Sequence, residues 1–146
     1  MPDPATSEYM RTLATSISCD WRAQPRPVHT FSLSVRVRQD VPVGAVLEAQ
    51  FENPTDSKRP LLASAVVAAS GFPEVKNDTV FLISPPVDTV RCKNYEVIVR
   101  LYRSKEAREL MGTHRQQVQS RMDSALWEAY GDNASERFAR QGHLCP

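Results

Sequence analysis

Apolar and polar side chains alternate along several short segments of the chain, and this pattern predicts β-strands with one buried face. Three segments follow it: 31–38, 47–52 and 95–102. Two further runs, 61–69 and 79–84, are apolar at almost every position. Because Ser64 is the one polar residue in the first of these runs, 61–69 is predicted to be a central strand covered on both faces.

Residues typical of turns separate these segments, and the intervals between them are too short for helical crossovers. All prolines except the last of the eleven lie at or before Pro86. The first part of the chain should therefore hold short strands joined by turns, whereas 87–145 can hold longer elements. The fold class that follows is a mainly β, antiparallel β-sandwich.

In the last third of the chain, the spacing of apolar residues changes to that of an amphipathic helix. Apolar residues form a stripe at helical spacing: Val118, Met122, Ala125, Leu126, Ala129 and Tyr130. Thr113 and Gln116 fit a capping box at the start of this helix, and Gly131 fits its end. We expect the stripe to be buried against the sheet.

A second, shorter helix is predicted after the first, with Asn133 as N-cap, Glu136 in its first turn and Gly142 at its end. The segment 104–112 has two interpretations. It is either a Ser-capped helical turn, which we favour, or a hairpin whose return strand carries Leu110 and Met111.

These patterns predict three parts of the chain. Residues 1–27 form an extended or weakly helical N-terminal segment, and 28–103 form the β-sandwich. Residues 104–146 form a helical C-terminal extension that packs on the sandwich.

One segment resembles a known class of domains. The run from Pro85 to Val99 contains an apolar residue, Val90, shortly before Tyr95 at the start of a predicted strand. This run is similar to the entry into the sixth strand of immunoglobulin-like and fibronectin-III-like domains, where a tyrosine hydroxyl bonds back to the preceding loop. The resemblance implies a structural corner at Val90 and Tyr95. It concerns the fold and carries no function.

Charge and cysteine content indicate which partners and which cellular compartment to expect. The formal net charge is +1, from 18 basic and 17 acidic residues, which argues against an obligate polyanion binder. The first residues do not follow the pattern of a secretory signal, and the three cysteines, Cys19, Cys92 and Cys145, are widely spaced. We therefore expect reduced thiols and a cytoplasmic protein, with the nucleus possible, that is not secreted. No apolar run is long enough to cross a membrane.

Motifs that carry chemistry are missing from the sequence. It has no glycine-rich phosphate loop, no nucleophile elbow and no Cys-x-x-Cys pair. His29 and His114 could serve acid–base chemistry beside a carboxylate, but their positions at the start of a predicted strand and of a predicted helix favour structural roles. We expect no enzyme, no cofactor and no metal site.

The remaining class is a non-catalytic protein-interaction module: a subunit of a larger complex, an adaptor or an assembly factor. Arginine, aromatic and aliphatic residues together are typical of interface centres. They are expected on the outer face of the sheet at five positions: Arg36, Arg38, Ile98, Arg100 and Tyr102. The expected partner is another protein or a second copy of the chain. The alternative cover for this face is the chain's own C-terminal helix.

Two other functions remain open. The small residues of 61–69 leave room for an apolar small molecule or lipid in the sandwich interior, which would make the protein a carrier. The strand arginines could also bind nucleic acid weakly through its phosphates, although acidic residues lie among them.

Overall fold

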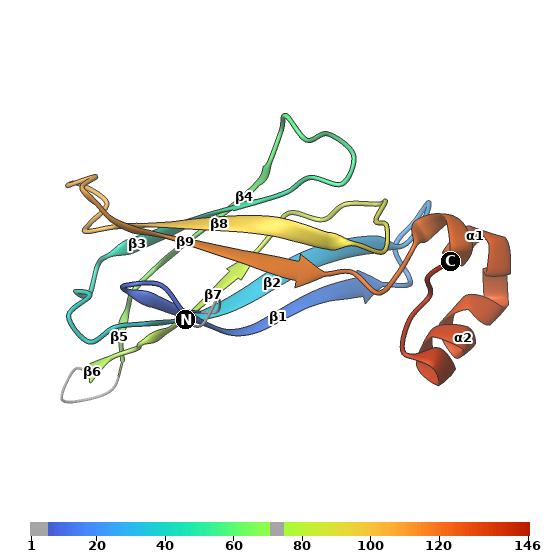
Figure 1. Ribbon diagram of the computed structural model, residues 1–146, viewed down its shortest axis with the longest axis horizontal. Helices are drawn as coiled ribbons and strands as arrows, with labels where there is room; N and C mark the ends of the chain where they lie inside the picture. Colours follow the sequence, from blue (N-terminus) through green and yellow to red (C-terminus); the bar gives the residue numbers. More distant parts are fainter. Residues whose placement is uncertain (1–5, 71–74) are drawn as a thin grey trace.

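Two antiparallel sheets that face each other form the body of the protein in the computed structural model, which describes residues 6–70 and 75–146 (Figure 1). One sheet has the strand order β1-β2-β7 and the other β4-β3-β8-β9, while β5 and β6 form a small separate pair. The strands are β1 (Met10–Asp20), β2 (Val28–Val37), β3 (Val46–Phe51), β4 (Leu61–Val66), β5 (Ala69–Ser70), β6 (Val75–Lys76), β7 (Thr79–Ile83), β8 (Asn94–Tyr102) and β9 (Leu110–Gln119).

The core lies between the two sheets and comes from the alternating apolar positions. Phe31 of β2 is fully buried and contacts aromatic rings of the opposite sheet. Its ring centroid lies 6.1 Å from that of Phe51 in β3 and 5.3 Å from that of Tyr95 in β8. The mainly β, antiparallel architecture predicted from the sequence is thus confirmed.

The prediction of a helix starting at Thr113 is wrong. Residues Leu110–Gln119 form β9, which pairs antiparallel with β8 at the edge of the four-stranded sheet, and Thr113 lies opposite Arg100. The alternation of apolar and polar side chains is weak in β9 because one of its inward positions holds the polar side chain of His114. The hairpin interpretation of 104–112 is the correct one.

The N-terminal segment also differs from its prediction. Met10–Asp20 forms β1 and pairs with β2 over its whole length, with a register shift between Thr12 and Ala14. Its inward positions include Thr12 and Thr15, so the apolar alternation that identifies a strand is weak. The sandwich therefore extends beyond the predicted 28–103 on both sides and includes β1 and β9.

The run 61–69 is not a central strand. Its first part, β4, pairs on one side with β3 and is the edge of the four-stranded sheet. The outward side chains of Leu62 and Val66 are exposed. Both faces of this run are apolar, which suggested that other parts of the chain cover both. Among the described residues, no other part of the chain covers its outer face.

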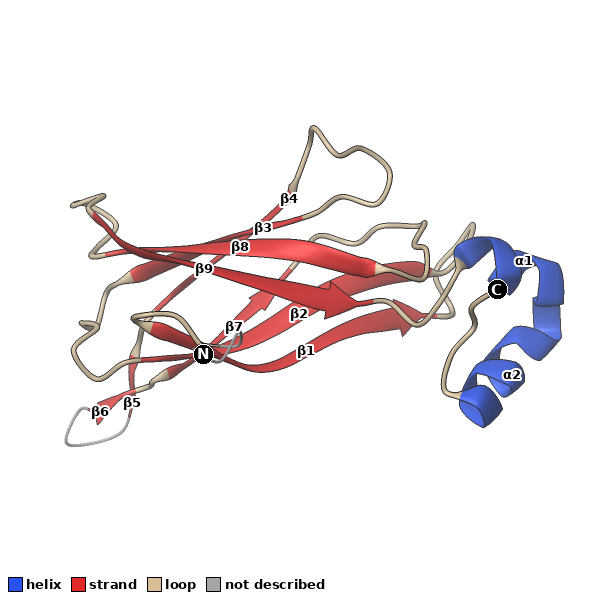
Figure 2. Ribbon diagram, in the orientation of Figure 1, coloured by secondary structure: helices blue, strands red, loops and turns tan. Residues whose placement is uncertain are grey.

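Two short helices, α1 (Ser124–Tyr130) and α2 (Ala134–Gln141), follow the last strand and are joined by a 3-10 turn, η1 (Gly131–Asn133). They lie beyond one end of the sandwich rather than over a sheet face (Figure 2). The ring of Trp127 in α1 stacks on Trp21 after β1, with centroids 4.1 Å apart. The expectation that this helix covers Ile98 and Tyr102 is therefore wrong.

The ends of the helices agree only in part with the predicted caps. The N-cap of α1 is Asp123, whose carboxylate accepts a hydrogen bond from the Ala125 N–H at 2.8 Å. Helix α2 ends at Gly142, which has a left-handed φ of 77°. Among the described residues, no helix is long and apolar enough to span a bilayer.

Candidate functional site

The five residues predicted to share an interaction surface lie on two different sheets. Arg36 belongs to β2 of the three-stranded sheet, and Arg38 follows directly after that strand. The other three, Ile98, Arg100 and Tyr102, belong to β8 of the four-stranded sheet. Because the sheets face each other, their outer faces point in opposite directions. The structure therefore does not bring the predicted surface together.

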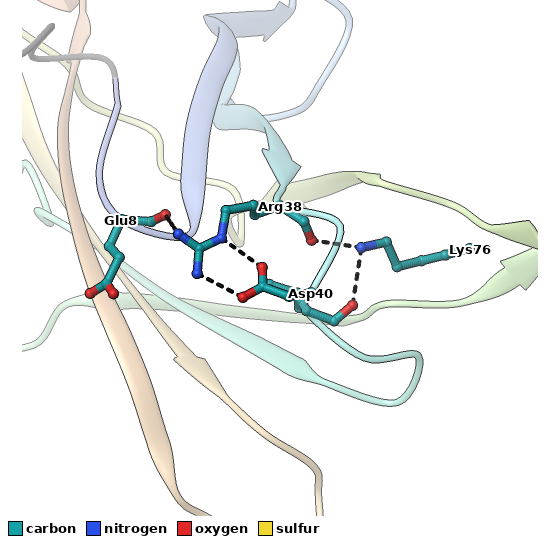
Figure 3. Close-up of polar contacts among 5 residues, drawn as sticks. Glu8, Arg38, Asp40 and Lys76 are labelled. Atoms are coloured by element: carbon teal, nitrogen blue, oxygen red, sulfur yellow. Dashed lines mark hydrogen bonds and ion pairs between the residues drawn. The ribbon is translucent and has the colours of Figure 1, made fainter.

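Arg38 is tied to its own neighbourhood by charged and backbone groups (Figure 3). Its guanidinium donates two hydrogen bonds to the carboxylate of Asp40, at 2.6 and 2.7 Å, and a third to the backbone carbonyl of Glu8 at 3.0 Å. The hydrogen bonds from Arg38 lower the pKa of the Asp40 carboxyl. Lys76 donates to the carbonyls of Arg38 and Val41. This arginine joins three segments of the chain and is already partnered.

The outer face of the four-stranded sheet carries a shallow groove. It is lined mainly by side chains of three neighbouring strands: Glu48, Gln50, Leu62, Ser64, Arg100 and Tyr102. Arg108 contacts two of these residues: its guanidinium lies 4.4 Å from the ring centroid of Tyr102 and donates hydrogen bonds of 2.9 and 3.1 Å to the Glu48 carboxylate. The Arg108 hydrogen bonds lower the pKa of the Glu48 carboxyl. Glu48 and Arg108 are therefore paired with each other.

The strongest surface feature is apolar and lies on the edge strands β4 and β7. Among the described residues, the four most exposed large hydrophobic side chains are all on these two strands: Phe81 at 67%, Leu62 and Ile83 at 61%, and Val66 at 55%. Strands β4 and β7 contact each other across the two sheets. One side of the sandwich therefore presents two adjacent edge strands. Each carries two large apolar side chains on the outer face of its own sheet, so the two pairs of side chains point in opposite directions. We call these four residues the β4/β7 edge.

Each of these two strands also has one edge that pairs with no other strand among the described residues. Within the described ranges, β3 is the sole ladder partner of β4, and β2 that of β7. Neither strand contains a charged residue, a proline or a bulge, which are the usual means of preventing edge-to-edge pairing. On the outer face beside Phe81 and Ile83 stand the small residues Ser34 and Ser32 of β2, which cannot cover the larger side chains.

Sequence reasoning missed this edge although the signal was present. The runs 61–69 and 79–84 are apolar on both faces, and a strand of that kind must be covered on both faces by something. The run 61–69 was predicted to be a central strand with both faces covered, and no cover was predicted for 79–84. In the structure, Val80 and Leu82 point into the core while Phe81 and Ile83 point out.

The predicted corner residues lie together at the start of β8. Val90 is fully buried, and the Tyr95 hydroxyl accepts a hydrogen bond of 2.9 Å from the backbone N–H of Arg91. Burial raises the pKa of the Tyr95 hydroxyl. The loop also anchors the C-terminal helices, because the Ser124 hydroxyl accepts from the Val90 N–H and the Ser124 N–H donates to the Val90 carbonyl.

The two buried histidines differ in their surroundings. In His114, Nε2 lies 2.7 Å from the Thr12 hydroxyl and Nδ1 lies 2.9 Å from the Ser7 hydroxyl. The side chain of His114 thus links β9 to the N-terminal segment. His29 is as deeply buried, and its Nδ1 has no hydrogen-bond partner. Burial lowers the pKa of both imidazoles.

The cysteines correct the expectation of three reduced thiols. Cys92 and Cys145 form a disulfide with a Cα–Cα distance of 5.8 Å, which ties the end of the chain to the loop before β8. Their separation of 53 residues hides this proximity in the sequence. Cys19 is a free, half-buried thiol, and burial raises its pKa to about 11.

Groups of three or more His, Cys, Asp and Glu side chains able to hold a metal are not found among the described residues. No protein-family model matches the chain, and no curated protein is significantly similar to it in sequence.

Proposed function

We propose that the chain is a non-catalytic protein-interaction module whose partner binds along the β4/β7 edge. The observation that carries the proposal is the exposure of Phe81, Ile83, Leu62 and Val66 on two neighbouring edge strands. Large apolar side chains exposed to water on an unpaired edge strand are typical of a surface that another chain covers.

The proposed occupant is an extended segment of another protein that adds to the sheet beside β7. Strand addition uses the backbone N–H and C=O groups that an edge strand leaves unpaired, and alternating side chains of the added strand supply specificity. Phe81 and Ile83 are two residues apart and stand on one face of β7. They fit an added strand with apolar residues at every second position.

We also assign the sandwich to the immunoglobulin-like and fibronectin-III-like class. Support comes from the strand order β1-β2-β7 against β4-β3-β8-β9 and from the bond between Tyr95 and Arg91. In the arrangement of a constant-type immunoglobulin domain, the fourth strand joins the sheet of the first two. Here β4 lies beside β3 instead.

The disulfide bears on the cellular compartment in which the proposed module acts. Disulfides form and persist in oxidising environments and are rare in the cytosol and nucleus. The bond between Cys92 and Cys145 therefore favours a module that acts in an oxidising compartment over the cytoplasmic location expected from the sequence.

The alternative functions have weaker support. Phe31, Phe51 and Tyr95 fill the space between the sheets, which argues against a lipid carrier that uses the interior. Of the strand arginines proposed to grip nucleic acid, Arg36 lies 3.6 Å from the Asp78 carboxylate, and Arg38 is bonded to Asp40.

The test compares partner binding by matched surface variants of the full chain. Phe81→Ser and Ile83→Ser each remove an exposed side chain from the β4/β7 edge, and Leu110→Ser removes one from the opposite edge strand, β9. A protein that co-purifies with the wild type should bind Phe81→Ser at least ~30-fold more weakly, the equivalent of losing one interface anchor of about 2 kcal/mol. Leu110→Ser should bind normally.

Sedimentation of the isolated protein separates the two possible partners. A monomer at micromolar concentration supports a different protein as the occupant, whereas a dimer that Phe81→Ser dissociates makes a second copy the occupant. Equal binding by wild type, Phe81→Ser and Ile83→Ser would overturn the proposal.

A further inference from the structure

Cys19 and His29 form a cross-strand pair at the helical end of the three-stranded sheet. They lie directly opposite each other in β1 and β2. The backbone N–H and C=O of His29 bond to Val87, at 2.6 and 2.8 Å, and therefore point away from β1. Cys19 and His29 are thus a non-hydrogen-bonded pair, the arrangement that brings facing side chains closest. Both lie on the inward face, in register with Ile17 and Phe31.

This pair lines a cavity between the end of the sandwich and the C-terminal helices. The cavity has a volume of about 420 Å³. Ile17, Trp21, Met122 and Phe138 supply its less polar part, and Gln119 and Arg121 are among its polar residues. Met122, which is buried, lines the same cavity as Cys19 and His29.

His29 is the residue that indicates a ligand. It is 3% exposed, and its Nδ1 is the one buried side-chain nitrogen or oxygen of the described residues that lacks a hydrogen-bond partner. Leaving such a group unpaired costs about 1–3 kcal/mol. Buried polar groups almost always have a hydrogen-bond partner, so the unpaired ring nitrogen of His29 indicates a ligand that bonds to it.

We propose that Cys19, His29 and Met122 form a binding site for a soft monovalent metal ion of the Cu⁺ type. A thiolate, an imidazole and a thioether together are the ligands that such an ion prefers, whereas harder ions select oxygen. Because its third ligand is a methionine, the site is not a cluster of His, Cys, Asp and Glu side chains alone.

Charge balance selects a monovalent ion. On binding, the S–H bond of Cys19 breaks, a sulfur–metal bond forms and the proton leaves to solvent, with no transfer of electrons. The thiolate and a monovalent cation then sum to zero charge. A divalent ion would leave a net positive charge in a half-buried cavity that Arg121 also lines, and an uncompensated buried charge is costly.

The experiment uses Ag⁺ as a probe because it shares the ligand preference of Cu⁺ and undergoes no redox change during the titration. The full-length oxidised protein is titrated in a chloride-free buffer, and bound metal is followed by native mass spectrometry and by the thermal melt. The wild type should bind one Ag⁺ per chain and melt at a higher temperature. Cys19→Ser should abolish binding.

The decisive variants are His29→Phe and Met122→Leu, because they distinguish a built site from a lone thiol. Each should weaken Ag⁺ binding by at least the ~10- to 100-fold that follows the loss of a supporting metal-site residue. His114→Gln, which changes the other buried histidine, should bind as the wild type does. If both decisive variants bind Ag⁺ like the wild type, Cys19 acts as an isolated thiol and the proposal is overturned.

A second measurement protects the test against unfolding of the variants. In the wild type, Ag⁺ should shift the ring nitrogen resonances of His29 and leave those of His114 and His143 unchanged. A bound ion that leaves the His29 ring nitrogens unmoved contradicts the site.

Discussion

The hydroxyl of Tyr95 accepts a hydrogen bond from the backbone N–H of Arg91, four residues earlier, at 2.9 Å. The ring of Tyr95 is 3% exposed and packs against Phe31 of the opposite sheet. A single side chain thus anchors the loop between β7 and β8 and fills part of the core.

Tyr95→Phe should separate these two roles. The variant keeps the ring and removes the bond to Arg91, so unfolding free energy should fall by about 0.5–1.5 kcal/mol. Tyr95→Ala also creates a cavity and should cost about 3–5 kcal/mol. Denaturant melts measure both. A Phe variant as stable as the wild type would show that the hydroxyl does not support the corner.

The strands that carry the core were predictable because their residues obey the period of 2 without ambiguity. Phe31, Leu33 and Val35 alternate with small or charged residues and face the opposite sheet. Strands β1 and β9 were not predictable by this rule, because Thr12 and His114 occupy inward positions where the two sheets meet at their edges. These residues bond to each other, so polar side chains satisfy the interior positions that apolar residues fill elsewhere.

The position of the proposed interaction surface was not predictable from the sequence. Composition indicates an interaction surface, but one sequence does not show which strands share a sheet, so Arg36 and Ile98 were placed together although they lie on opposite faces. The apolar runs that form the β4/β7 edge were recognised as strands. Their position at the edges depends on long-range pairing, which local patterns do not encode.

The start of the first helix gives a second test of local structure. Asp123 caps α1 by accepting from the Ala125 N–H, whereas Thr113 is exposed in the middle of β9. Asp123→Ala should therefore lower the unfolding free energy by about 0.5–2 kcal/mol. Thr113→Ala should change it by less than about 0.5 kcal/mol, as is usual for surface substitutions. A larger loss at Thr113 than at Asp123 contradicts these assignments.

The disulfide should stabilise the attachment of the helices. Cys92→Ser with Cys145→Ser removes a link between residues 53 positions apart, and the double variant should lose about 2–4 kcal/mol, mainly because its unfolded chain is less restricted. Urea melts of the wild type and the double variant measure the loss.

Alkylation of the unfolded, unreduced protein before mass spectrometry checks the bond itself. It should label Cys19 alone. Labelling of all three cysteines in protein taken directly from its native compartment contradicts both the bond and the proposed oxidising environment.

Stability should also fall in mild acid because of the buried histidines. Burial lowers the pKa of His29 and His114 below the ordinary value of 6.5, so the unfolded chain binds more protons than the folded one as pH drops through that value. Unfolding free energy then decreases with falling pH, with a slope of at most about 1.4 kcal/mol per pH unit for each histidine. From about one pH unit above 6.5, both groups are almost wholly neutral in either state, and the contribution is complete.

His114 allows this effect to be assigned. Its ring nitrogens lie within hydrogen-bond distance of the hydroxyls of Thr12 and Ser7, which can also accept from a protonated ring, so the acid penalty comes from burying the charge rather than from losing a bond. His114→Gln should therefore reduce the pH dependence of urea melts between pH 7.5 and pH 5, whatever it does to stability at neutral pH. His29→Gln should reduce it further, and the double variant should be nearly flat over this range. A wild type whose stability is constant between these values, or a double variant with an unchanged slope, would show that the imidazoles are not the groups that titrate.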